Sequence, residues 1–273
     1  MPSFAACLSD EQMLAHSAFL GYNLAMFHLI AVGFDAVIYR PFYNALVFLV
    51  GVIPAHDVGI AVVALTIIVR FLLFPLSRRA VQAQLAMKKI APEIEKLKEK
   101  YKDKQEEQGR AIFALYKERG VHPFSGFALT LVQIPILLGL YWVFSRGGLP
   151  TIDTNLLYSF VHAPASVNME FLGLINMKSR SILLAVTAAL AQFIYTRLSM
   201  GPSEKSSPVE ASLSGDMAKS FEIQARYVLP AIVGVIGFSL ASAAPLYWTT
   251  SNTFMILQEW FSGRRFNDSA KKS

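Results

Sequence analysis

Charged residues are scarce in this chain of 273 residues. Asp, Glu, Lys and Arg make up only 16% of it, whereas 54% of the residues are hydrophobic. A typical soluble domain contains about 25% charged residues. The composition therefore excludes an ordinary soluble domain and predicts a polytopic membrane protein.

Cysteine and catalytic motifs are scarce as well. The one cysteine, Cys7, excludes an internal disulfide framework or a thiolate metal cluster. The segment Phe4–Cys7 is similar to a lipoprotein cleavage box, but no charged and apolar leader precedes it, so lipidation of Cys7 stays open. The chain lacks metalloprotease, nucleophile-elbow and phosphate-loop motifs and has no pair of intramembrane aspartates. We therefore expect no enzyme, no cofactor and no metal site.

Long apolar runs, by contrast, are abundant. Five of them come near the roughly 20 residues that a membrane-spanning helix needs: Val58–Leu76, Phe124–Phe144, Ser181–Leu198, Tyr227–Ala244 and Pro245–Phe261. They predict an all-α polytopic membrane protein whose core, over 57–262, has five transmembrane helices. Pro245 marks the predicted break between the last two spans.

Three segments lie outside this core: an apolar N-terminal region at 1–34, a predicted amphipathic helix at 35–56 and a C-terminal tail at 263–273. In the N-terminal region, 1–34, the stretch 15–34 is open between an extra span, an uncleaved signal anchor and an interfacial helix. Residues 35–56 mix polar and apolar side chains, as an amphipathic helix on the extracytoplasmic membrane surface does, with a short buried helix as the alternative. Residues 263–273 form a short basic tail.

Basic residues are concentrated in two places. Twelve of the 25 Lys and Arg residues lie between Arg78 and Arg119, and four more lie in the C-terminal tail, whereas residues 1–57 contain only Arg40. The positive-inside rule then places the basic segment and the C-terminus in the cytoplasm, and 147–179 outside. Five spans satisfy this arrangement.

The polar segment 82–120 between the first two spans is predicted to form a cytoplasmic helical hairpin. An apolar stripe at helical spacing runs along its first half: Ile90, Ile94, Leu97 and Tyr101. Pro92 suits a first helical turn, and 103–109 is a predicted turn before a second helix at Arg110–Arg119. The hairpin is either a solvated linker or a docking surface for a partner or an incoming chain.

Arg70 is the one charge inside the first apolar run. A guanidinium at membrane depth costs at least about 2.5–3.5 kcal/mol, so it normally faces a watery cavity or a partner. The next cation, Arg78, marks the expected exit of the helix, and eight residues at about 1.5 Å each place Arg70 roughly 12 Å inside that boundary. We therefore expect Arg70 to line a hydrated cleft.

Uncharged polar side chains accompany Arg70 in the spans. Thr66 lies one helical turn before it, on the same face. The others are Gln133, Gln192, Ser251, Asn252 and, in the same stripe of the last span, Trp248 and Glu259. Interhelical hydrogen bonds that hold the bundle together are the alternative reading of each Gln, Thr or Ser. Glu259 is the only acid at comparable depth, so we expect it to lie within reach of Arg70.

Three segments together resemble the YidC/Oxa/Albino family of membrane protein insertases. They are LTIIVRFLLFPL at 65–76 with APEIEKLKEKY at 91–101, LYKERGVHP at 115–123 with QIPILLGLYW at 133–142, and LYWTTSN at 246–252. Their order, spacing and inferred topology agree with the family, and the match covers about 35–261. The chain is most similar to short bacterial members.

The resemblance implies a five-helix core around a hydrophilic groove that is open to the cytoplasm and the inner leaflet but closed outside. The groove arginine of the family corresponds to Arg70. The groove neighbours correspond to Thr66, Gln133, Gln192, Tyr247 and Trp248. In the implied mechanism, the groove hydrates the polar end of a client membrane protein, Arg70 attracts its acidic residues, and the apolar helix of the client slides into lipid.

The resemblance also implies a place and partners. The place is the bacterial inner membrane, and the partners are client proteins and lipid, with the Sec translocon and the translating ribosome as candidates for the hairpin and the tail; no specific nucleic acid is expected. The chain departs from the family at Glu259, where a Gln is usual, and at Ala244–Pro245, which replaces a Gly-containing turn. A small anion channel or transporter and a passive assembly chaperone for membrane complexes are the alternatives.

Overall fold

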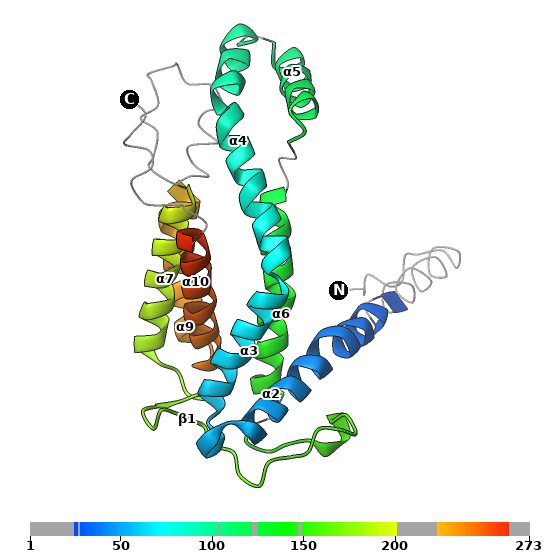
Figure 1. Ribbon diagram of the computed structural model, residues 1–273, viewed down its shortest axis with the longest axis vertical. Helices are drawn as coiled ribbons and strands as arrows, with labels where there is room; N and C mark the ends of the chain where they lie inside the picture. The colour runs from blue at the N-terminus through cyan, green and yellow to red at the C-terminus, as the bar shows by residue number, and fades with distance from the viewer. Residues whose placement is uncertain are drawn as a thin grey trace, which may run out of the picture.

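The computed structural model describes residues 25–26, 28–102, 104–121, 125–146, 149–200 and 223–261. They form a bundle of long helices, with a helical hairpin projecting from one end and a loop region at the other (Figure 1). The predicted all-α fold is confirmed, because the strands of the described ranges are only two residues each, β1 (Glu170–Phe171) and β2 (Ile175–Asn176).

The bundle consists of helices that correspond to the predicted apolar runs. They are α3 (Val58–Leu72), α6 (Ser125–Ser145), α7 (Ile182–Met200), α9 (Leu229–Ser239), preceded by the π-helical turn η5 (Gln224–Val228), and α10 (Ala243–Phe261). α10 packs against the other four helices. Side chains of α10 can therefore contact side chains of each of the other four helices.

Length and composition identify fewer membrane spans than the five predicted. Among the described residues, the helices 28–52 and 182–199 are each long and apolar enough to cross a membrane, and the bent pair 58–72 and 74–80 could count as a third. The apolar helices 133–145 and 224–239 are shorter. The last helix, α10, carries Thr, Ser, Asn, Gln and Glu side chains, which lower its hydropathy.

The chain enters the bundle through one continuous helix at 28–52. It contains a π-helical turn, η2 (Asp35–Tyr39), and continues as α2 (Arg40–Val52). Its buried side chains form one stripe at helical spacing: Tyr39, Tyr43, Leu46, Val47 and Val50. The helix ends at Val52, before the predicted limit of 56, because a 3₁₀ turn at Pro54–His56 follows. The predictions for 1–24, with Cys7, and for the tail 263–273 lie outside the described residues.

The first predicted span is shorter than expected. α3 ends at Leu72, and α4 (Phe74–Lys100) starts after a bend of 60°. Pro75 explains the break, because it has no N–H to continue the hydrogen-bond ladder of α3 and it suits the first turn of α4. Arg70 therefore lies in the last turn of α3, three residues before the bend.

The break between the last two spans lies earlier than predicted. α9 ends at Ser239 and α10 begins at Ala243, so 240–242 form the turn. Pro245 occupies the first turn of α10, where the missing N–H would have no partner within the helix. The predicted break at Pro245 therefore lies three residues after the turn.

The projecting hairpin consists of α4 and α5 (Gln105–Glu118). The predicted pair of helices is present, but two details were wrong. Pro92 lies inside α4 instead of in its first turn, because α4 begins eighteen residues earlier, in the apolar run. The second helix begins at Gln105 rather than Arg110, which leaves Gly109 inside it.

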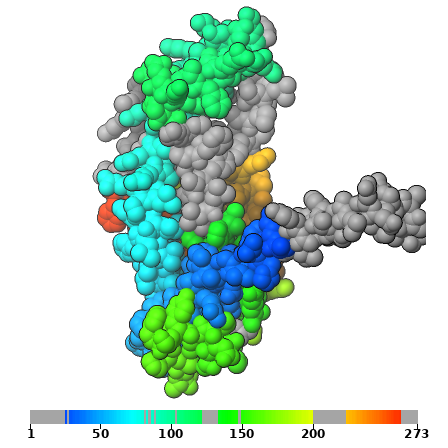
Figure 2. Space-filling model, turned by 90° about the vertical axis from the view of Figure 1, so that its right-hand side faces the viewer, coloured from blue at the N-terminus to red at the C-terminus, as the bar shows by residue number. Residues whose placement is uncertain are grey.

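The opposite end of the bundle is covered by the loop 149–181, which contains β1 and β2. The loop is the green mass beneath the blue N-terminal helix in Figure 2. Asp57 joins the loop to α3: its carboxylate accepts hydrogen bonds from the backbone N–H of Ile60 at 3.0 Å and of Leu172 at 2.8 Å. A Cβ atom on Gly59 would lie 2.4 Å from the ring of Phe171, so only glycine allows this approach.

Candidate functional site

Arg70 is buried in the bundle, with only 5% of its surface exposed. Its Nε donates a hydrogen bond to the hydroxyl of Ser251 at 2.8 Å, and its Nη2 donates to Oε1 of Gln133 at 2.8 Å and also to Ser251. The amide of Gln133 in turn donates to the hydroxyl of Tyr247. These four residues, the arginine cluster, connect α3, α6 and α10.

No carboxylate contacts Arg70 within the part of the chain that the structure describes. Its hydrogen bonds go to a hydroxyl and an amide oxygen, which compensate a buried cation less than a carboxylate would. The predicted contact with Glu259 is wrong, because Ser251 is the partner on α10. Glu259 lies eight residues farther along that helix, about 12 Å at 1.5 Å per residue.

A second contact fixes the register of α10 against the chain that leads into the hairpin. Nε2 of Gln258 donates to the hydroxyl of Ser77 at 2.8 Å. Ser77 and Gln258 each lie seven residues, about two turns, beyond Arg70 and Ser251. The two elements therefore run in the same direction, and their contact continues past the bend at Leu73.

A second group of polar side chains joins α10 to α7. The side-chain amide of Asn252 donates to Oε1 of Gln192 at 2.9 Å, and Nε2 of Gln192 donates to the hydroxyl of Thr196 at 3.1 Å. Asn252 follows Ser251 directly, and neighbouring residues on a helix point about 100° apart. α10 thus presents polar groups to α3 and α6 on one side and to α7 on another.

The remaining predicted site residues are placed differently. Thr66 is buried on the face of Arg70, but its hydroxyl donates to the carbonyl of Val62 at 2.6 Å, within its own helix. Trp248 is half-buried, and its side chain makes no hydrogen bond among the described residues. Glu259 is buried, with 2% of its surface exposed, beyond the arginine cluster. The cluster therefore contains four of the nine predicted residues, and Gln192 with Asn252 forms the second group.

Sequence reasoning missed Ser77, Thr196 and Gln258. Two of them could have been predicted from helical periodicity, because Thr196 lies one turn after Gln192 and Gln258 lies two turns after Ser251, each on the same helix face. Ser77 had none, since it followed the expected end of the first span. Its role depends on the bend between α3 and α4.

The arginine cluster offers groups that can bind an anion reversibly. Its polar groups are a guanidinium, an amide and two hydroxyls, which bind one another. A guanidinium can bind a carboxylate through two parallel hydrogen bonds. The cluster could therefore exchange its neutral partners for an acidic group.

The fold and this site define the class: an all-α membrane protein whose helix bundle contains a buried arginine held by neutral side chains. The family model described as 60Kd inner membrane protein matches residues 48–270, and the chain belongs to this family. The resemblance to the YidC/Oxa/Albino family drawn from the sequence is thereby confirmed.

Two relatives show how far the similarity extends. The chain is 27% identical over 214 residues to the membrane protein insertase YidC of Francisella philomiragia, and 28% identical over 214 residues to that of Francisella tularensis subsp. novicida. Each alignment covers 78% of this chain and 34% of the relative. The chain therefore spans about a third of the length of these curated relatives.

Proposed function

We propose that this protein is a membrane protein insertase, which helps client membrane proteins to enter and fold in the bilayer. The observation that carries the proposal is Arg70, which is buried in the bundle and bound, among the residues that the structure describes, only to the neutral side chains of Ser251 and Gln133. The names of the relatives, membrane protein insertase YidC, support the same function.

The proposed mechanism is an exchange of hydrogen-bond partners. An acidic residue in the polar end of a client displaces Ser251 and Gln133 from Arg70, because a carboxylate accepts two parallel hydrogen bonds from the guanidinium and also compensates its charge, which a hydroxyl or an amide oxygen does not. The client's polar groups are thereby satisfied at membrane depth, where each unsatisfied group would cost several kcal/mol. Its apolar helix then moves into lipid along α6 and α10.

The exchange requires a groove that opens toward the cytoplasm and the inner leaflet and stays closed outside. Support for the closed side comes from the loop 149–181, which Asp57 fastens to α3. In this proposal α3, α6, α7, α9 and α10 are the five crossings, and the hairpin and the C-terminus lie in the cytoplasm of a bacterial cell. Thr66, Gln192, Asn252, Trp248 and Glu259 line the opened groove.

The hairpin is the proposed meeting point with cytoplasmic partners, of which the Sec translocon and the translating ribosome are the candidates. Its surface offers both kinds of contact. Phe113 of α5 is 66% exposed, while Arg110 and Glu106 form an exposed ion pair at 2.6 Å beside it. A docking partner would cover this apolar ring and meet charges of both signs.

Insertion into proteoliposomes tests the proposal. The client is a single-span protein with an acidic outer tail, and the measurement is the rate at which the tail becomes protected from protease. We expect Arg70→Ala to lower the rate by a factor of about ten to a hundred, since a charge-assisted hydrogen bond is worth about 1.5–3 kcal/mol. The matched control is Arg197→Ala, an exposed arginine in the last turn of α7, which should leave the rate unchanged.

A client with a neutral tail separates charge from hydration. Its insertion should depend little on Arg70, because it offers no carboxylate for the guanidinium. Equal insertion of the acidic client by the wild type and Arg70→Ala would contradict the exchange mechanism. Anion flux without any client, lost in Arg70→Ala, would favour a channel instead.

A further inference from the structure

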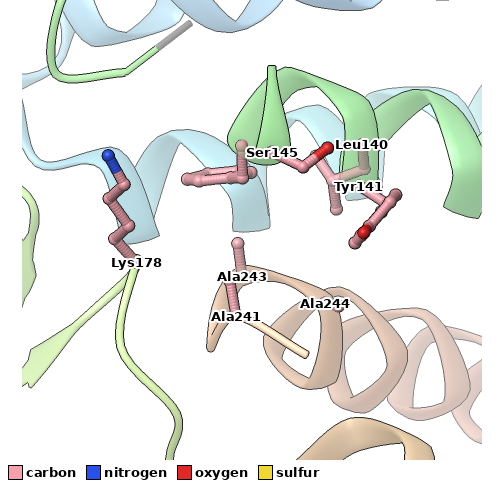
Figure 3. Close-up of a pocket in the computed structure, with 8 residues that line it drawn as sticks. Leu140, Tyr141, Ser145, Lys178, Ala241, Ala243 and Ala244 are labelled. Atoms are coloured by element: carbon pink, nitrogen blue, oxygen red, sulfur yellow. The ribbon is translucent and has the colours of Figure 1, made fainter. Parts of the chain in front are cut away.

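A pocket of about 240 Å³ lies where α6, the turn between α9 and α10, and the end of the loop 149–181 meet. In Figure 3 Lys178 stands on one side of it, Ser145 and Tyr141 on the other, and small side chains form the base. Its lining is Leu140, Tyr141, Phe144, Ser145, Lys178, Ala241, Ala243 and Ala244. Every lining segment is a helix end or a loop, so in the proposed topology the pocket lies at the outer membrane surface.

We propose that this pocket binds an anionic phospholipid of the outer leaflet. The ammonium of Lys178 and the hydroxyl of Ser145 would hold the phosphate, and the apolar base would take the glycerol and the start of an acyl chain. The inference relies on the topology given above, because it needs the pocket at headgroup level. It is otherwise independent of client insertion.

Lys178 is held in place by its neighbours while its charge stays uncompensated. The carbonyls of Met177 and Ser179 accept hydrogen bonds from the backbone N–H of Ala243 at 3.2 Å and of Ser242 at 2.8 Å. Lys178 therefore sits in a stretch that is tied on both sides to the α9–α10 turn. Its ammonium makes no ion pair with any residue that the structure describes, so an anion can approach it.

The nearest cation along α6, Arg146, is engaged elsewhere. Its guanidinium lies 4.3 Å from the ring centre of Trp142 and 5.4 Å from that of Tyr39, and 3.7 Å from the carboxylate of Asp35. These contacts turn it toward the N-terminal helix. Lys178 is thus the cation that gives the pocket its charge, and a basic side chain near an anionic headgroup contributes about 1 kcal/mol.

The pocket is too small for a whole lipid, and an apolar path leads away from it. The exposed side chains of Tyr141, Leu138 and Ile134 follow one another at intervals of three and four residues along α6. This stripe extends about 10 Å toward the middle of the helix. An acyl chain that starts in the pocket can therefore continue along α6 inside the bilayer.

The alanines before Pro245 leave the space that the pocket occupies. Ala241, Ala243 and Ala244 line the pocket, and larger side chains there would fill it. Pro245 packs against α9, since its Cβ lies 3.4 Å from where a Cβ on Gly237 would be. The turn is thus held close to α9 while its small residues leave space on the other side.

A lipid titration of the purified full chain by native mass spectrometry tests the proposal. The probes are phosphatidylglycerol, diacylglycerol with the same chains, and glycerol 3-phosphate. We expect phosphatidylglycerol to bind most tightly. Lys178→Ala should weaken it about fivefold, and Ala241→Phe, which fills the pocket from its base, should weaken it similarly.

The matched control is Arg180→Ala, which removes an exposed cation two residues away without touching the pocket, and it should leave binding unchanged. Equal losses in Lys178→Ala and Arg180→Ala would overturn the proposal in favour of diffuse surface charge. Binding of glycerol 3-phosphate as tight as that of phosphatidylglycerol would overturn the lipid assignment. No client is present, so a negative result leaves the insertase proposal intact, and a failed insertion assay does not affect this one.

Discussion

Two groups of buried polar side chains lie at different levels of this protein and bind different kinds of partner. At the end that the loop 149–181 covers, Asn44 and Asp57 bind backbone: Asn44 donates to the carbonyl of Leu156 at 2.9 Å and accepts from the N–H of Tyr158 at 2.6 Å, while Asp57 accepts from that of Leu172. We call these two residues and their bonds the outer seal, because the proposed topology places this end outside. In the arginine cluster, by contrast, side chains bind side chains.

The difference lies in what must move to break each group. A backbone partner leaves only if its loop unfolds, so opening the outer seal costs the packing of the loop 149–181 as well as the hydrogen bonds. A side-chain partner leaves by rotating about its own bonds, and a new polar group can take its place. The outer seal is therefore suited to permanent closure, and the arginine cluster to exchange.

The largest expected effect is on the outer seal. Asp57→Ala should lower the free energy of unfolding by about 3 kcal/mol, because two backbone N–H groups lose a charged acceptor in a site where Asp57 is only 3% exposed. Unfolding in mixed micelles titrated with SDS measures this. The control is Asp153→Ala, an exposed cap that accepts from the N–H of Asn155, with an expected loss below about 1 kcal/mol.

Equal losses for Asp57→Ala and Asp153→Ala would mean that the seal contributes no more than an ordinary turn. The claim that the outer seal resists opening more than the arginine cluster does would then be wrong.

A double-mutant cycle on Arg70 and Ser251 gives the next largest effect. Ser251→Ala should cost about 2 kcal/mol of stability, because it leaves donors of a buried guanidinium without an acceptor. In the Arg70→Ala background the same change should cost almost nothing, so the coupling energy is about 2 kcal/mol. Unfolding of the four variants in micelles measures it.

The corresponding cycle on Arg70 and Glu259→Gln is the matched comparison. It should give a coupling of less than about 0.5 kcal/mol, since residues that do not touch are additive within that limit. A larger coupling would restore the charge pair that the sequence suggested and would contradict the position of Ser251.

The two groups were not equally visible in the sequence. Arg70 was found because a charge in an apolar run is rare, and Gln133 and Ser251 because polar residues are few in spans. The prediction that Glu259 is the partner of Arg70 was wrong. It estimated the depth of both residues by counting from the terminal arginines, and such a count does not give the register of α3 against α10. That register depends on packing between residues 181 positions apart.

The outer seal was missed for a related reason. Asp57 lies at a helix end and Asn44 lies inside a helix that mixes polar and apolar side chains, and in such places a polar residue can have many roles. Their partners lie in the loop, more than 100 positions away, and carry no signal because they are backbone groups. The bend at Pro75 could have been predicted, whereas the contact between Ser77 and Gln258 could not, because it requires the bend and the register together.

A smaller effect is expected for the polar pair on the other side of α10. The hydrogen bond from Asn252 to Gln192 should give a coupling of about 0.6 kcal/mol in an Ala/Ala cycle, the average for such bonds between helices in a membrane. Stability in micelles measures it, with Thr187 and Thr249, whose hydroxyls lie 3.3 Å apart, as a weaker reference pair. A coupling as large as that of Arg70 and Ser251 would show that charge is not what distinguishes the arginine cluster.

The smallest effect belongs to a polar pair outside the bundle. Nη2 of Arg119 donates to both carboxylate oxygens of Glu93, at 3.0 and 2.9 Å, and joins the two helices of the hairpin. The side chains are 48% and 41% exposed, so water screens the pair and its coupling should be about 0.5 kcal/mol. Hydrogen exchange of α5 in Arg119→Ala, Glu93→Gln and the double variant measures it, and 1 M salt, with a Debye length of about 3 Å, should remove the coupling. A coupling that survives high salt would mean that the hairpin is held rigidly at this pair, so that a partner would meet a preformed surface instead of a flexible one.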